Sequence, residues 1–197
     1  MFIRVLTYTN VSSHSLLILT YYLYADVYTF WLPLETTYEY DSGSNGSMFV
    51  VKALQDLDIT SLDINTMFRA MGAVRVYTRA GSYNGHESNS NGWELVYDNP
   101  LTQMNGRGRA TKLEKFDNVV SISSGQNQSF YIWAELKLVY KRGSVEGRPF
   151  VSDDNLVIYE GIGLKGHFGE VRYSPRVWSG VITYRTTSLL SSVAELI

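Results

Sequence analysis

The loop that spans Gly81–Asn91 carries the side chains best suited to chemistry in this chain of 197 residues. Its candidate residues, with the tryptophan that follows it, are Tyr83, Asn84, His86, Glu87 and Trp93. An aromatic ring can lie against the apolar face of a sugar, and amide and carboxylate groups can hydrogen-bond the sugar hydroxyls. These residues therefore form a candidate carbohydrate-binding set. The alternative is an ordered hairpin loop whose polar groups bond their own backbone.

A second segment, Ser174–Gly180, adds Arg176 and Trp178 to the candidate binding set. The two side chains are two positions apart, so they lie on one face of an extended chain. A core position is the favoured interpretation for Trp178, ahead of a ligand platform. For Arg176 we expect an ion pair with Glu160 or Glu170.

Metal ligands are sparse. The chain has no cysteine, and its three histidines are His14, His86 and His167. Nothing in their spacing brings together the three or more ligands that zinc requires. Asp153 and Asp154 are weak calcium candidates because the spacing of an EF-hand loop is missing, and a turn is the preferred interpretation. We expect no metal and no cofactor.

No catalytic motif stands out in the sequence. The G-x-S-x-G pattern of a serine nucleophile on a sharp turn is absent. Gly161–Gly166 (GIGLKG) resembles a dinucleotide loop, but no helical pattern follows it and Pro175 comes soon after, so we reject that interpretation. Paired carboxylates for sugar hydrolysis meet in space, and no pair is singled out by sequence. The chain is therefore expected not to be an enzyme, and a glycan lyase or hydrolase on a sandwich scaffold is the third interpretation after the two non-catalytic ones below.

Composition excludes some partners. The chain has 17 Lys+Arg against 19 Asp+Glu, a formal net charge of -2, so no basic field is available for nucleic acid. Charged residues make up only 18%, below the roughly 25% of average domains. The 15 tyrosines and 16 glycines are typical of strands and turns, and also of extracellular modules.

From Thr37 onward the pattern predicts short strands separated by turns rich in Gly, Ser, Asn and Asp. The expected strands are 48–53, 57–65, 74–79, 93–97, 112–122, 129–134, 135–141, 156–160 and 177–185. A change of phase between Ile59 and Leu62 predicts a bulge, and Asp41–Ser47 is expected to be a turn. Asn65–Met71 is compatible with a helical turn. Such spacing predicts an all-β fold, an antiparallel β-sandwich that we expect to be jelly-roll-like, over residues 37–186.

The two ends are set apart from this domain. Residues 1–36 form an apolar leader, and residues 187–197 form a C-terminal tail compatible with a short helix. The leader has four interpretations: a secretory signal, a membrane helix over residues 15–34 that Asp26 would oppose, extra strands, or a stretch that is not the native start. A signal or anchor is the favoured one.

Several runs, taken together, resemble an uncharacterised module of secreted and surface proteins from bacteria and microalgae. They are Asn45–Ala53, Asp58–Asn65, Val76–Glu87, Trp93–Val96, Ile158–Gly163, Phe168–Gly169 and Ser174–Gly180. The resemblance covers about residues 40–185 and implies a β-sandwich in extracellular proteins, with no assigned activity. The basic residues Arg107, Arg109, Lys112 and Lys115 depart from it, and a solvated loop is the simplest account.

These observations predict a non-catalytic binding or adhesion module, secreted or at the cell surface. Its partner would be a glycan or a surface protein, bound through the loop 81–91. The alternative is a self-assembling structural protein, such as a shell, matrix or filament subunit, since low charge and many tyrosines suit packed protein surfaces. No contact with nucleic acid is expected, and none with a membrane except through residues 15–34.

Overall fold

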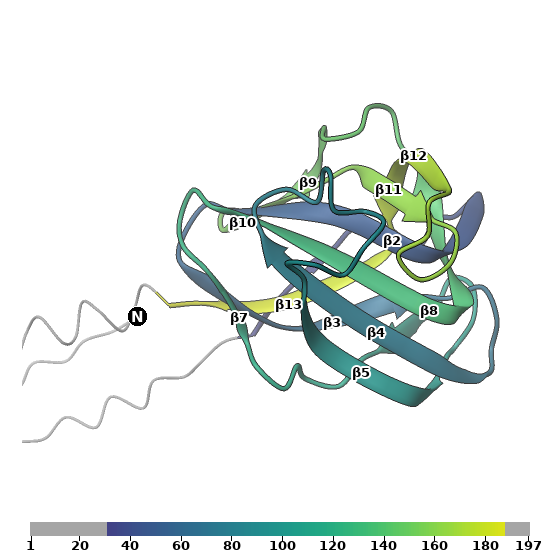
Figure 1. Ribbon diagram of the computed structural model, residues 1–197. Helices are drawn as coiled ribbons and strands as arrows, with labels where there is room; N and C mark the ends of the chain where they lie inside the picture. Colours follow the sequence, from purple (N-terminus) through teal and green to yellow (C-terminus); the bar gives the residue numbers. More distant parts are fainter. Residues whose placement is uncertain (1–30, 188–197) are drawn as a thin grey trace, which may run out of the picture.

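The computed structural model of the protein describes residues 31–187 as two packed antiparallel sheets (Figure 1). The five-stranded sheet contains β1 (Leu32–Glu35), β3 (Leu57–Asn65), β6 (Ala110–Lys112), β7 (Val120–Ile122) and β13 (Gly180–Thr186). The eight-stranded sheet, in the order β5-β4-β8-β12-β11-β2-β10-β9, contains β2 (Ser42–Ala53), β4 (Met71–Ala80), β5 (Glu94–Gln103), β8 (Asn127–Arg142), β9 (Pro149–Ser152), β10 (Leu156–Tyr159), β11 (Gly161–Leu164) and β12 (Arg172–Trp178).

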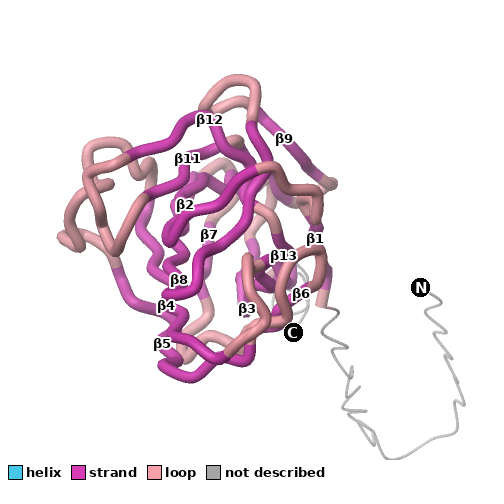
Figure 2. The backbone as a smooth tube through the Cα atoms, turned by 90° about the vertical axis from the view of Figure 1, so that its right-hand side faces the viewer, coloured by secondary structure: helices cyan, strands magenta, loops and turns pink. Residues whose placement is uncertain are grey.

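The predicted all-β antiparallel fold is confirmed. Every pair of neighbouring strands is antiparallel, and the described part of the chain contains no helix (Figure 2). Accordingly, residues 31–187 include no helix of the length and apolarity that a bilayer span needs.

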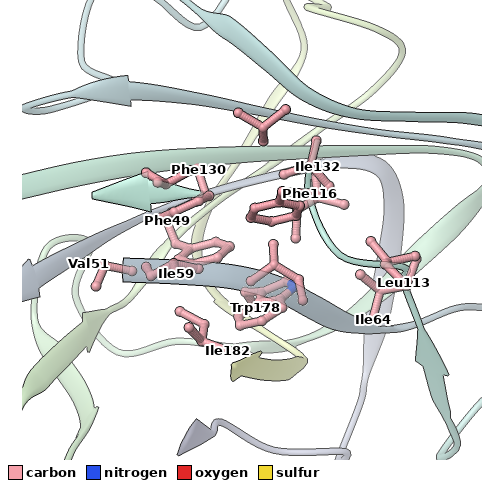
Figure 3. Packing of buried hydrophobic residues seen from close by; sticks show 14 of the residues in the cluster. Phe49, Val51, Ile59, Ile64, Leu113, Phe116, Phe130, Ile132, Trp178 and Ile182 are labelled. Atoms are coloured by element: carbon pink, nitrogen blue, oxygen red, sulfur yellow. The ribbon is translucent and has the colours of Figure 1, made fainter. Parts of the chain in front are cut away.

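The core lies between the two sheets because each strand turns alternate side chains inward. From β2 of the larger sheet, Phe49 and Val51 point inward, and from β3 of the smaller sheet Ile59 does the same. Trp178 is 2% exposed and stacks on Phe49, with ring centroids 4.4 Å apart (Figure 3). The predicted core position of Trp178 is confirmed.

The change of phase in the third strand is a bulge, as predicted. Thr183 of β13 pairs with Ser61, but the next residue, Tyr184, pairs with Ile59, so Thr60 is the extra residue of β3. The bulge keeps Ile59 and Leu62 both buried although they are three positions apart.

The predicted turn at Asp41–Ser47 is wrong. β2 begins at Ser42 and pairs with β8, with a register irregularity between Ser44 and Gly46. Small residues are needed here because the strands approach closely: a Cβ at Gly43 would overlap the carbonyl oxygen of Leu138. The turn-like composition therefore reflects crowding within a sheet.

The helical turn considered for Asn65–Met71 is also wrong. Asn65 ends β3 and Met71 begins β4, and the residues between them form no helical turn. The Asn65 side chain donates a 3.0 Å hydrogen bond to the hydroxyl of Ser179, and Thr66 forms a bridge with Leu138. These long-range contacts hold the segment extended and prevent a local helical turn.

The first strand lies within the expected leader. Leu32–Glu35 forms β1 and pairs with Val181–Tyr184 of β13, so the sheet begins before the expected boundary at residue 37. The interpretation of the leader as extra strands therefore holds for these four residues. The proposals for residues 1–30, and a C-terminal helix over 188–197, lie outside the described residues.

Candidate functional site

The outer face of the larger sheet carries a second set of packed side chains. We call it the outer aromatic cluster, and its buried members are Met48, Tyr77, Tyr83, Tyr131, Ile162 and Leu164. The loop after β11 covers it: the hydroxyl of Tyr131 accepts a 3.0 Å hydrogen bond from the backbone N–H of Phe168, whose ring lies 4.5 Å from that of Tyr131. The outer aromatic cluster therefore anchors two loops of that face, the one after β4 through Tyr83 and the one after β11 through Phe168.

A pocket of about 550 Å³ opens beside this cluster. The residues lining this outer-face pocket are Val50, Lys52, Ser82, Tyr83, Asn84, Gly125, Asn127, Glu146, Gly147, Tyr159 and Glu160. Its volume falls within the range of roughly 300–1,000 Å³ that is usual for small-molecule sites. Three loops, three strands and the link between β10 and β11 contribute, so segments distant in sequence form one concave surface.

Neighbouring strands form the floor of the pocket. Lys52 of β2 is paired with Asn127 of β8 on one side and with Val157 of β10 on the other. Tyr159 follows Val157 by two positions, so both face outward with Lys52, opposite to the buried Ile158. The polar ends of Lys52 and Asn127 and the half-buried ring of Tyr159 therefore share one face.

Tyr83 forms part of the wall. Its side chain is 3% exposed, and its hydroxyl donates a 3.0 Å hydrogen bond to Oε1 of Glu146. Burial, and next the charge of Glu146, raise the pKa of the Tyr83 hydroxyl far above its ordinary value of 10.0. The phenol stays neutral and acts as a donor, and its ring is not free to serve as an open platform for a sugar.

Glu146 receives three donors. Besides Tyr83, the guanidinium of Arg172 and the hydroxyl of Ser174 bond its carboxylate. Burial alone would raise the pKa of Glu146, but the hydrogen bonds from Ser174, Tyr83 and Arg172 outweigh it and lower this pKa below its ordinary 4.5. Arg172 also lies 3.6 Å from Glu87, so one cation connects the two loops.

Glu160 is the second carboxylate of the pocket, and at 5% exposed it is more deeply buried than Glu146. It accepts hydrogen bonds from the backbone N–H and hydroxyl of Ser144 and from the backbone N–H of Val145, the last two at 2.8 and 2.9 Å. Its oxygens are therefore held by the loop between β8 and β9.

The predicted ion pair of Arg176 with Glu160 or Glu170 is wrong. Neither pair is among the ion pairs of residues 31–187. Instead, the Arg176 guanidinium lies 5.2 Å from the centre of the Tyr140 ring, and Nη1 donates a 2.7 Å hydrogen bond to the carbonyl of Pro175. The bonds that Glu160 accepts from the adjacent loop had no signal in the sequence.

The remaining candidates of the loop 81–91 stabilise the loop. The indole Nε1 of Trp93 donates a 2.9 Å hydrogen bond to the carbonyl of His86, whose own N–H bonds the carbonyl of Tyr83 at 2.9 Å. Of the predicted set, only Tyr83 and Asn84 line the pocket. His86, Glu87 and Trp93 support the loop, whereas Arg176 and Trp178 lie away from the pocket.

The calcium candidates form a turn, which was the preferred interpretation. Oδ1 of Asp153 accepts hydrogen bonds from the backbone N–H groups of Asn155 and Leu156 at 2.8 and 3.0 Å, and Oδ2 accepts one from the hydroxyl of Tyr184 at 2.6 Å. Asp154 is exposed. Within residues 31–187, no three His, Asp or Glu side chains are grouped as metal ligands.

Four residues that line the pocket were not among the predicted site residues: Lys52, Asn127, Glu146 and Tyr159. Lys52 had a signal, because it is the one charged residue in the apolar run Met48–Ala53. Tyr159 had none, because it stands in the continuous run Leu156–Glu160, and only the structure shows that buried and half-buried positions alternate in β10. Glu146 and Asn127 reach the pocket through long-range pairing, which leaves no local signal.

The chain matches no protein-family model and no curated protein. The resemblance to secreted modules stays a prediction.

Proposed function

We propose that this protein is a non-catalytic binding module that takes a saccharide in the outer-face pocket. The observation that carries the proposal is the mixture of groups on the pocket floor: the half-buried ring of Tyr159 beside the polar ends of Lys52 and Asn127, with Asn84 at the wall. A ring for an apolar sugar face and several donors and acceptors for hydroxyls is what sugar recognition requires.

The proposal changes the role of the loop 81–91. Asn84 would contact the ligand, while Tyr83 would hold the wall through Glu146, and Tyr159 would take over the aromatic role expected of Tyr83. Both carboxylates of the pocket are held by donors from the protein, which supports a binding role over an acid–base role. Display on a secreted or surface protein is part of this proposal and depends on the sequence resemblance.

A glycan array followed by titration calorimetry tests the proposal. We expect at least one oligosaccharide to bind, and Tyr159→Ala to weaken its binding about tenfold or more, since losing a stacked ring costs on the order of 1–2 kcal/mol. Tyr40→Ala is the matched control, because Tyr40 is 42% exposed and lies outside the pocket. A blank array, or equal losses in the two variants, would overturn the proposal.

A second candidate function is self-association through the edge of the larger sheet. β5 is the outermost strand there and exposes Leu95 and Leu101, at 47% and 67%. An open edge with apolar side chains can pair with a second chain. Light scattering should then show a concentration-dependent dimer that Leu101→Lys dissociates and that Val145→Lys, at another exposed apolar position, leaves intact. A monomer at every concentration would exclude it.

A further inference from the structure

Lys52 is the charged side chain of the outer-face pocket that has no partner among the residues the structure describes. It is half-buried on the pocket floor, and it forms neither an ion pair nor a side-chain hydrogen bond with any residue of the described range 31–187. Because no described protein group bonds the Lys52 ammonium, a ligand acceptor placed there can gain a charge-assisted hydrogen bond.

The two carboxylates that line the same pocket do not neutralise this ammonium. Glu146 is paired with Arg172 and also bonded by Tyr83. Glu160 is 5% exposed and accepts three hydrogen bonds from Ser144 and Val145. Within residues 31–187, Lys52 is thus the charged side chain of the lining whose hydrogen-bonding capacity is unfilled.

Strand register sets the position of Lys52 relative to the aromatic ring. Lys52 is directly opposite Val157, and Tyr159 is two residues further along the same strand. Diagonal neighbours of this kind are about 7–8 Å apart, and their Cβ atoms somewhat less. That separation suits a pyranose ring stacked on Tyr159 whose exocyclic group extends toward the Lys52 ammonium.

We infer that the saccharide is acidic, with a sugar-ring carboxylate bound by Lys52 and the ring stacked on Tyr159. This inference rests on the proposed function. Asn127, the cross-strand partner of Lys52, is placed to donate its side-chain amide to the same carboxylate. Because the lining contains one lysine and the chain has a net charge of -2, the pocket suits a single carboxylate per site and not a densely sulfated chain.

Matched acidic and neutral probes test the inference. The acidic probes are hexamers of galacturonate and of mannuronate, and the neutral probes are the same hexamers after reduction of their carboxyl groups, with linkage unchanged. Calorimetry at low and moderate salt is run on the wild type, on Lys52→Gln and on Lys112→Gln, which removes an exposed lysine of β6 outside the pocket.

We expect at least one acidic hexamer to bind about tenfold more tightly than its reduced form, as one charge-assisted hydrogen bond allows. Lys52→Gln should abolish this preference without weakening neutral binding, and Lys112→Gln should retain it. If neutral probes bind as tightly as acidic ones, or if Lys52→Gln weakens both equally, the inference falls while the saccharide proposal stands. If no probe binds and the glycan array is also blank, the proposed function falls and the inference falls with it.

Discussion

The hydroxyl of Tyr83 donates a 3.0 Å hydrogen bond to Oε1 of Glu146, although the two residues are 63 positions apart in the chain. The contact joins the loop between β4 and β5 to the loop between β8 and β9. Arg172 of β12 bonds the same carboxylate and lies 3.6 Å from Glu87. These contacts hold the loop between β4 and β5, which carries Tyr83 and Glu87, against the loop between β8 and β9, which carries Glu146.

Glu146→Gln should destabilise the fold and loosen the contact between these two loops. The amide oxygen can still accept from Tyr83, but the ion pair with Arg172 is lost and the new NH₂ group faces existing donors. We expect the free energy of unfolding in urea to fall by about 1–3 kcal/mol. Glu114→Gln is the control because Glu114 is exposed and makes no side-chain hydrogen bond with the described residues. Equal stability of the two variants would contradict the role given to Glu146.

The same carboxylate predicts a pH dependence. Its pKa in the folded protein is below the ordinary 4.5, because hydrogen bonds to the ionised form outweigh the effect of burial. The stabilisation is therefore complete above the unfolded pKa and is lost as pH falls through the folded one. Urea midpoints measured between about pH 5 and pH 3 should decline in the wild type. The decline should be shallower in Glu146→Gln, and parallel profiles would rule out this carboxylate as a source.

Local patterns predicted the fold class and the irregularity in β3. The alternation of apolar and polar residues, and the point where it changes phase, can both be read from neighbouring positions in the sequence. The same approach failed at Asp41–Ser47, where glycines serve close strand contact and not a turn. Glycine-rich composition alone does not separate these two uses. Only the partner strand, which the local sequence does not specify, decides between them.

The candidate site was predicted only in part, for the same reason. Asn84 and Tyr83 come from one loop and could be found by composition. Lys52, Asn127 and Tyr159 come from three strands and meet through register, so no sequence spacing relates them. Composition suggested a sugar-binding role for Tyr83 but carried no information about its burial, which comes from packing in the outer aromatic cluster.

His167 should titrate below its ordinary pKa of 6.5. Burial is the main cause, and the positive charge of Arg75 adds to it, while Asp98 acts in the opposite direction. Arg75 is paired with Asp98 at 3.1 Å, so Arg75→Gln removes a cation and also frees an anion. Both effects raise the pKa of His167, which NMR titration of the imidazole protons measures directly. Arg107→Gln, at a distant exposed site, should leave the midpoint in place, and a downward shift in Arg75→Gln would contradict the assignment.

Trp178→Ala should cost far more stability than Trp31→Ala. The ring of Trp178 is buried and stacked on Phe49, and its loss leaves a cavity in the core, at a cost of about 3–5 kcal/mol. Trp31 is 41% exposed and contacts Lys115 and Arg185 through its ring face, which predicts a loss of about 1 kcal/mol or less. Urea unfolding compares the two. Similar losses would mean that Trp178 does not anchor the core.

Gly161→Ala should prevent or severely weaken folding, because Gly161 begins the buried strand β11 (Gly161–Leu164). A Cβ at Gly161 would overlap the carbonyl oxygen of Met48 in the neighbouring strand β2, and backbone cannot move aside without breaking the sheet. Gly72→Ala is the matched control: its Cβ would meet side-chain atoms of Leu136 at 3.0–3.1 Å, which can shift. We expect Gly161→Ala to lose about 3 kcal/mol or more and Gly72→Ala markedly less, by thermal and urea unfolding. If the two variants are equally stable, close packing of β11 on β2 is not what requires glycine at position 161.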